Sequence, residues 1–285
     1  MCNHQNHNGK RIKEIDLRKS FLEQDFQTED CENKKFVPFK CLRINTVEQL
    51  YFLFKEMFSQ EKESQFLYRG QSNADWFLDC TLEREVEKYS IPICTQEIEK
   101  KVFHNFKMNL RGKLTDQSLL KITHIDDERE LWAIGRHYDL KTPLMDWSSS
   151  LYVALFMAFS ETKENNEISD YSAVFIVNSK FFPECSTFSN RYWFTPTTDY
   201  YGRITAQKGF LSHYSIREHI KEKLNQGYLC AFKIYIKSDL RNEILAYLKH
   251  IGIEYTTMYP DLLGAVKFAN NELKEYLIKR TPSNK

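Results

Sequence analysis

The sequence predicts an α+β domain in which short strands form a mixed or antiparallel sheet enclosed by helices. Residues 172–177, SAVFIV, are apolar and rich in β-branched side chains, as is typical of a buried strand. Residues 229–236, LCAFKIYI, alternate as a second strand does. Residues 151–159, LYVALFMAF, are apolar nearly all round but too short to cross a bilayer, so they indicate a central core helix.

The first half of the chain adds helices and one strand. A helix beginning near Thr46 is predicted because apolar residues recur at helical spacing: Val47, Leu50, Tyr51, Phe54 and Phe58. Residues 66–70 predict a short strand ended by Gly70, with a loop at 71–76. Residues 82–112 and 128–138 predict further helices, which lead into the central stretch.

The second half is less regular. A polar loop is expected at 161–170, and a long segment at 181–201 shows no clean period; loops of that length are uncommon without a functional reason. Residues 203–210 alternate, which predicts a strand with Gln207 near its end. A helix is expected at 239–250 and a last helix after the turn at 259–265.

Asp146-Trp147-Ser148 precedes the central helix, which is predicted to begin near Ser149. As a turn at the positively polarised end of that helix, it would offer backbone donors to an anion and an indole face for stacking. The alternative is a capping box with a core tryptophan.

Composition restricts the function classes. Forty basic and thirty-nine acidic residues give no electrostatic case for a membrane or nucleic-acid partner. The N-terminus lacks the apolar core of a signal peptide, and we expect a cytoplasmic protein without a membrane span.

Residues 1–38 and the basic tail 279–285 are predicted to be mobile and dispensable for folding, because they contain few core-forming residues. The cysteines show no metal-ligand spacing, so we expect reduced thiols and no metal: Cys2, Cys31, Cys41, Cys80, Cys94, Cys185 and Cys230.

Three side chains have both a functional and a structural interpretation. Arg69 at a strand end is either a phosphate clamp, beside a glycine that lets a ligand approach the backbone, or half of a structural salt bridge. His137 is either a general base or a buried hydrogen-bonded residue, and His213 is a weaker acid–base candidate. Asp261 is either a helix N-cap or a site carboxylate.

Four ordered motifs resemble the FRG domain family, named for a Phe-Arg-Gly element that is Tyr68-Arg69-Gly70 here: residues 67–72, 137–159, 203–209 and 252–264. The resemblance covers residues 66–268 and implies one FRG domain over residues 39–278. The sequence departs from the family at four positions, with Arg136 for Gln, Asp139 for Gly, Pro143 for Arg, and Leu263 for the second Asp of PDLDG.

The same elements are more distantly similar to the ADP-ribosyltransferase superfamily. Its first element corresponds to Tyr68-Arg69-Gly70 and its second to Asp146-Trp147-Ser148 with the helix behind it. The third is a strand with a catalytic Glu, for which Gln207 is the nearest match; an amide can hold a ribose hydroxyl but supplies no charge. The resemblance therefore implies a pocket for an NAD-like nucleotide in an ADP-ribosyltransferase-like sheet more strongly than it implies ADP-ribosyl transfer activity.

The leading hypothesis is a domain that binds NAD as a substrate and acts as an ADP-ribosyltransferase or NAD glycohydrolase on a protein or nucleic-acid acceptor. The candidate catalytic residues are Arg69, His137 and Gln207. The candidate nucleotide-binding residues are Tyr68, Gly70, Gln71, Asp146, Trp147, Ser148 and Arg203. The alternatives are a nucleotide- or nucleic-acid-processing domain without glycosidic chemistry and a non-catalytic interaction or sensor module.

Overall fold

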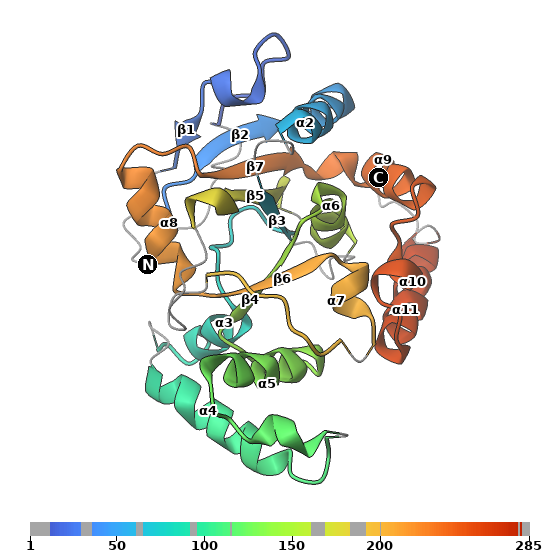
Figure 1. Ribbon diagram of the computed structural model, residues 1–285. Helices are drawn as coiled ribbons and strands as arrows, with labels where there is room; N and C mark the ends of the chain where they lie inside the picture. Colours follow the sequence, from blue (N-terminus) through green and yellow to red (C-terminus); the bar gives the residue numbers. More distant parts are fainter. Residues whose placement is uncertain are drawn as a thin grey trace.

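The computed structural model describes residues 12–29, 36–60, 65–91, 96–114, 116–160, 169–182, 192–199, 201–278 and 280 (Figure 1). The first eleven residues, most of the predicted loop at 161–170 and most of the basic tail lie outside these ranges.

The described residues form one open, mixed sheet of seven strands in the order β1-β2-β7-β5-β3-β4-β6. Within it β2 and β7 run parallel, and the other neighbours are antiparallel. The strands are β1 Gln27–Thr28, β2 Lys40–Ile44, β3 Phe66–Gln71, β4 Leu144–Ser148, β5 Tyr171–Asn178, β6 Gly209–His213 and β7 Ala231–Lys237. The α+β prediction is confirmed, including the strands expected at 66–70, 172–177 and 229–236.

Helices cover both faces of this sheet (Figure 1). They are α2 Val47–Gln60, α3 Thr81–Glu87, α4 Gln96–Asn109, α5 Ile125–His137, α6 Leu151–Phe159, α7 Arg203–Ala206, α8 Ile216–Asn225, α9 Arg241–His250, α10 Tyr255–Met258 and α11 Leu262–Ile278. Short 3-10 turns lie at Phe21–Glu23, Gln117–Leu120, Ser179–Phe181 and Ser238–Leu240. The predicted core helix is α6, of which nearly every residue is buried.

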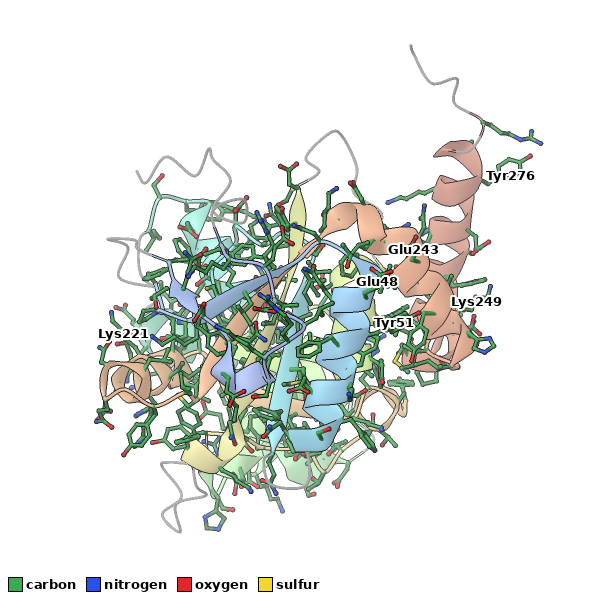
Figure 2. The ribbon with its side chains drawn as sticks, turned by 90° about the horizontal axis from the view of Figure 1, so that it is seen from above. Glu48, Tyr51, Lys221, Glu243, Lys249 and Tyr276 are labelled. Atoms are coloured by element: carbon green, nitrogen blue, oxygen red, sulfur yellow. The ribbon has the colours of Figure 1, made fainter. Side chains whose placement is uncertain are left out.

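The alternation of buried side chains along β5 divides the core in two. Val174 and Ile176 point into the cluster formed with α2, α6 and α9. Phe175 and Val177 point into a second cluster that includes α3 and α8. On the first face α2 and α9 lie side by side, with the ring centroids of Tyr51 and Tyr247 5.7 Å apart (Figure 2). Because side chains alternate along a strand, one apolar strand supplies both cores.

Gly70 lets α6 pack directly on β3. A Cβ atom at this position would lie 1.9 Å from the backbone oxygen of Ala154, a distance that no side chain tolerates. The need for glycine is therefore explained by helix–strand packing, and the ligand-approach explanation is not required.

The N-terminal segment belongs in part to the core. Ile15 and Phe21 are buried, with Phe21 fully inaccessible and packed edge-on against Phe232. Glu29 pairs with the buried Lys233 at 3.2 Å. The prediction that this segment has too few apolar residues to pack is wrong for residues 12–29, because Ile12, Ile15 and Phe21 are buried in the core although the segment around them is polar.

Two local predictions are also wrong. Asp146-Trp147-Ser148 lies in strand β4, not in a turn, since β4 pairs along its whole length with β6. The capping residues that follow at 148–150 obscured that strand. Arg203–Ala206 is a short helix, α7, and the strand begins only at Gly209. The carboxylate of Asp199 accepts hydrogen bonds from the N–H groups of Ile204 and Thr205, which selects the helix over the strand.

Candidate functional site

The sheet opens between β3 and β4. Their register in the described chain consists of a single pair, Tyr68 with Ser148. Beyond it β3 continues to pair with β5, and β4 continues to pair with β6. The side chain of Arg69 enters the gap and donates from Nη1 to the backbone oxygen of Asp146 at 2.7 Å. A side chain thus replaces a ladder hydrogen bond, and the two strands separate around it.

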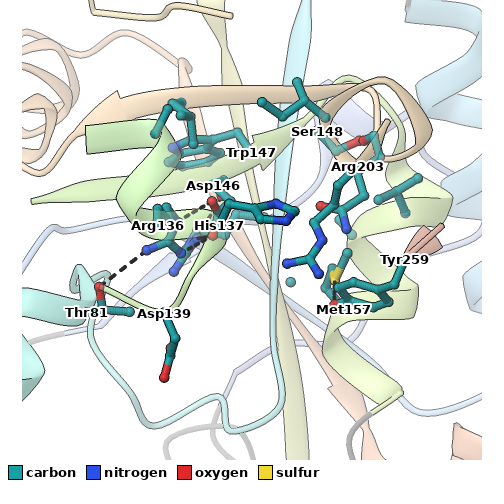
Figure 3. Close-up of a pocket in the computed structure, with 18 of the residues that line it drawn as sticks. Thr81, Arg136, His137, Asp139, Asp146, Trp147, Ser148, Met157, Arg203 and Tyr259 are labelled. Carbon is teal, nitrogen blue, oxygen red and sulfur yellow. Dashed lines mark hydrogen bonds and ion pairs between the residues drawn. The ribbon is translucent and has the colours of Figure 1, made fainter. Parts of the chain in front are cut away.

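A cavity of about 520 Å³ lies at this opening (Figure 3). All ten candidate residues line it: Tyr68, Arg69, Gly70, Gln71, His137, Asp146, Trp147, Ser148, Arg203 and Gln207. The prediction that the three motif elements converge on one pocket is confirmed, whereas the functional roles of these residues remain predictions. Other lining residues were not among the candidates, including Trp76, Arg84, Arg136, Tyr201, Tyr259 and Lys267.

Arg136 of α5 makes the closest contacts with Asp146. Its Nε and Nη2 donate to the two carboxylate oxygens, which is the bidentate geometry of a strong ion pair (Figure 3). The Asp146 side chain is recessed but half accessible through the cavity. Burial alone would raise the pKa of Asp146, but the charge and hydrogen bonds of Arg136 outweigh it and lower that pKa below its ordinary value. Asp146 is therefore held as a carboxylate.

Arg69 is less well compensated. Its side chain is only 9% exposed and its Nη1 lies 3.8 Å from the Asp146 carboxylate. Burial lowers the pKa of Arg69 to about 10, despite the opposing effect of Asp146, while the pKa of Arg136 is raised because Asp146 outweighs burial there. Arg69 Nε is buried and has no hydrogen-bond partner among the described residues. The surrounding protein therefore offsets only part of the free-energy cost of burying the Arg69 charge.

A second polar cluster is formed around Asp261. Arg203 Nη2 is 2.7 Å from Asp261 Oδ2, and His137 Nε2 is 3.4 Å from the same oxygen. Asp261 Oδ1 also accepts the backbone N–H of Gly264 at 2.7 Å. The N-cap interpretation of Asp261 is therefore confirmed; Asp261 does not line the cavity itself but contacts two side chains that do.

His137 is held in a defined position. Its ring stacks on Tyr201 with centroids 4.7 Å apart and planes at 10°. Burial and the nearby charge of Arg203 lower the pKa of His137 below 6.5, against the opposing effect of Asp261 and Asp199. At neutral pH the imidazole is therefore uncharged and able to accept a proton.

The remaining candidates have structural contacts. Trp147 is 3% exposed and donates from Nε1 to Ser212 Oγ at 2.9 Å, as expected of a core tryptophan. Ser148 Oγ donates to the backbone oxygen of Gln207 at 2.7 Å. Gln207 Nε2 donates to the backbone oxygen of Met258 at 2.9 Å, which ties the end of α7 to α10.

His213 lies on another part of the surface. It is not among the lining residues and contacts Glu99 Oε2 at 3.3 Å and Ser215 Oγ at 2.8 Å. His213 as an acid–base candidate of this site is therefore wrong, since β6 carries it away from the cavity.

Sequence reasoning missed the role of Arg136, although its position was noted as a departure from the family. The available signal was its place immediately before His137 at the end of a helix. Within the described ranges no cluster of three or more His, Cys, Asp or Glu side chains is arranged to hold a metal. Of the helices in the part of the chain that the structure describes, none is both long and apolar enough to span a membrane.

Comparison with known proteins gives one match. Residues 64–167 match the family model of the FRG domain. No curated protein and no solved structure matches the chain significantly. The matched residues run from just before β3 to just beyond α6 and include Arg69, Arg136, His137 and Asp146. This match supports the FRG family for the segment that supplies most of the cavity's charged side chains.

Proposed function

We propose that this FRG domain binds NAD in the cavity between β3 and β4 and cleaves its nicotinamide glycosidic bond. One observation carries the proposal: Arg69, which lies far from His137 and Asp146 in the sequence, lines one cavity of about 520 Å³ with them. That volume lies within the usual range for small-molecule sites. The motif order that resembles ADP-ribosyltransferases supports NAD as the nucleotide.

The diphosphate of NAD would bind at Arg69. Five basic residues line the cavity, Arg69, Arg84, Arg136, Arg203 and Lys267, against three acidic ones, Asp139, Asp146 and Asp199. The charge of Asp146 is largely matched by Arg136, and Asp199 accepts hydrogen bonds at the start of α7. A phosphate beside Arg69 would supply the acceptor that its Nε lacks and would offset the cost of burying its charge.

His137 would accept a proton in the reaction. Attack by water or an acceptor hydroxyl at C1′ of the ribose breaks the bond to nicotinamide N1, and nicotinamide leaves with that electron pair. The proton of the attacking oxygen passes to the neutral imidazole of His137. The Oε1 of Gln207 would accept a hydrogen bond from a ribose hydroxyl while its Nε2 stays on Met258.

Free nicotinamide released from NAD by the purified protein tests the activity, and calorimetric titration with ADP-ribose tests binding. We expect Arg69→Ala to lose affinity for ADP-ribose by about ten- to a hundredfold, since a charge-assisted hydrogen bond is lost. Arg111→Ala is the matched control, because Arg111 is exposed and does not line the cavity. Melting temperatures of both variants separate loss of binding from loss of folding.

A second candidate is a nucleotide- or nucleic-acid-processing domain without glycosidic chemistry. It is favoured by the amide at Gln207, where the resemblance calls for a carboxylate. Binding of ADP-ribose without nicotinamide release would select this alternative. If neither ADP-ribose nor a short oligonucleotide binds, the non-catalytic interaction module is the better description.

A further inference from the structure

Trp76 differs from every other tryptophan of this chain. Trp76 is 48% exposed and lines the cavity. The other three are buried in the core, with exposed fractions of 3% for Trp132, 3% for Trp147 and 9% for Trp193. No aromatic ring of the described residues stacks on the Trp76 indole. A large apolar ring left open at the mouth of a charged cavity typically marks a binding surface.

The loop that presents Trp76 is firmly anchored. The Ala74 N–H donates to the backbone oxygen of Tyr171 at 3.0 Å, and Gln71 Nε2 donates to the backbone oxygen of Phe77 at 3.1 Å. Ala74 and Leu78, on either side of the tryptophan, are 1% and 2% exposed. The exposed indole is therefore held on an ordered backbone, so that stacking a ligand on it costs little conformational entropy.

We infer that Trp76 is the surface on which the base of a bound nucleoside diphosphate stacks. This inference rests on the proposed function and adds a second point of recognition to it. Trp76 follows β3 in the chain, so one segment supplies both the arginine for the phosphates and the indole for the base. Arg84, in the last turn of the next helix, α3, lines the same cavity and adds a second positive charge.

The inference predicts separable contributions from base and phosphate. Base–aromatic stacking contributes about 1–3 kcal/mol, so Trp76→Leu should weaken ADP-ribose binding by about five- to a hundredfold. Trp76→Phe keeps an aromatic face and should retain most of that affinity. Pyrophosphate and ribose 5-phosphate carry no base, and their affinities should be equal in the wild type and both variants.

Tryptophan fluorescence supplies an independent measurement. Trp147 also lines the cavity but is only 3% exposed, so most of the quenching by ADP-ribose should come from the 48% exposed Trp76 and be lost in Trp76→Phe. Pyrophosphate should cause no quenching. Tyr89→Leu is the matched control, since Tyr89 is 72% exposed and does not line the cavity.

The outcomes separate this inference from the proposed function. If wild type and Trp76→Leu bind ADP-ribose equally and no quenching occurs, base stacking on Trp76 is wrong while the nucleotide site stands. If the wild type binds neither ADP-ribose nor pyrophosphate, the proposed function fails and the inference fails with it. Quenching by ADP-ribose together with the loss of affinity in Trp76→Leu supports both.

Discussion

Arg69 satisfies a backbone acceptor of the neighbouring strand β4, because its Nη1 donates to the carbonyl oxygen of Asp146 at 2.7 Å. The same guanidinium lies 3.8 Å from the Asp146 carboxylate and keeps a buried Nε without a partner among the described residues. The structural and the ligand-binding interpretations of Arg69 are therefore compatible. One side chain holds the strands apart and faces the space that opens between them.

Asp146→Asn should destabilise the protein by about 1–3 kcal/mol, because it removes the charge opposite two recessed guanidiniums while keeping some hydrogen bonding. The pKa of Asp146 is lowered from 3.8, so its contribution is present above about pH 4 and is lost as the pH falls further. Urea unfolding of the variant measures the change. Asp139→Asn is the control, since Asp139 is 92% exposed. Equal stability of both variants would show that Asp146 does not organise the arginines.

Gly70→Ala should cost about 3 kcal/mol or more, since the new Cβ would lie 1.9 Å from a backbone oxygen of α6 that cannot move without the helix. Thermal unfolding measures this loss. In Gly209→Ala the nearest atoms, a side-chain carbon and the backbone oxygen of Ile204, both lie at 3.3 Å, so a smaller loss is expected. A Gly70→Ala protein that melts like the wild type would contradict the packing of α6 on β3.

Gln207→Glu should lower stability by about 1–3 kcal/mol and should not raise nicotinamide release. A glutamate would place a carboxylate oxygen against the Met258 backbone oxygen that now accepts a hydrogen bond at 2.9 Å. Melting temperature and nicotinamide release are measured together. Gln207→Met, which removes the donor without adding charge, separates the lost hydrogen bond from the repulsion. Faster release from the glutamate variant would instead support an oxocarbenium-like state beside this position.

His137→Gln should make stability less dependent on pH. The pKa of His137 is lowered below 6.5 in the folded state, so the unfolded chain binds the proton first and acid favours unfolding. We expect the wild type to lose stability relative to the variant as the pH falls from 7.5 to 5, measured by denaturant titration at both values. His250→Gln, at an exposed position, serves as the control. If His137 is the base, the decrease of nicotinamide release at acid pH should also be absent in His137→Gln.

Phe21→Ala should cost about 3–5 kcal/mol, as for other fully buried aromatic side chains. The expectation that the N-terminal segment is dispensable gives the opposite result for this residue. Leu22→Ala is the neighbouring control, because Leu22 is 42% exposed. Denaturant midpoints of the two variants decide between these outcomes.

Local patterns in the sequence were sufficient for the elements whose signal lies within one segment. The apolar residues from Val47 recur at helical spacing because one face of α2 is buried. The residues up to Val177 form a continuous apolar run because both faces of β5 are buried. The motif at Tyr68-Arg69-Gly70 likewise indicated a strand that ends at a site, and it lies in β3 at the cavity.

The tertiary structure decided everything that depends on a distant partner. Residues 144–148 are a strand because β6 pairs with them, and a capping signal immediately downstream hid this. Phe21 is buried because a sheet face is open to receive it, although its own segment is polar. Asp146 meets Arg136 only because α5 packs beside β4, and this contact leaves Arg69 as the less compensated cation. Periodicity reports how much of a segment is buried, but which charges meet inside a cavity is set by packing between segments far apart in the chain.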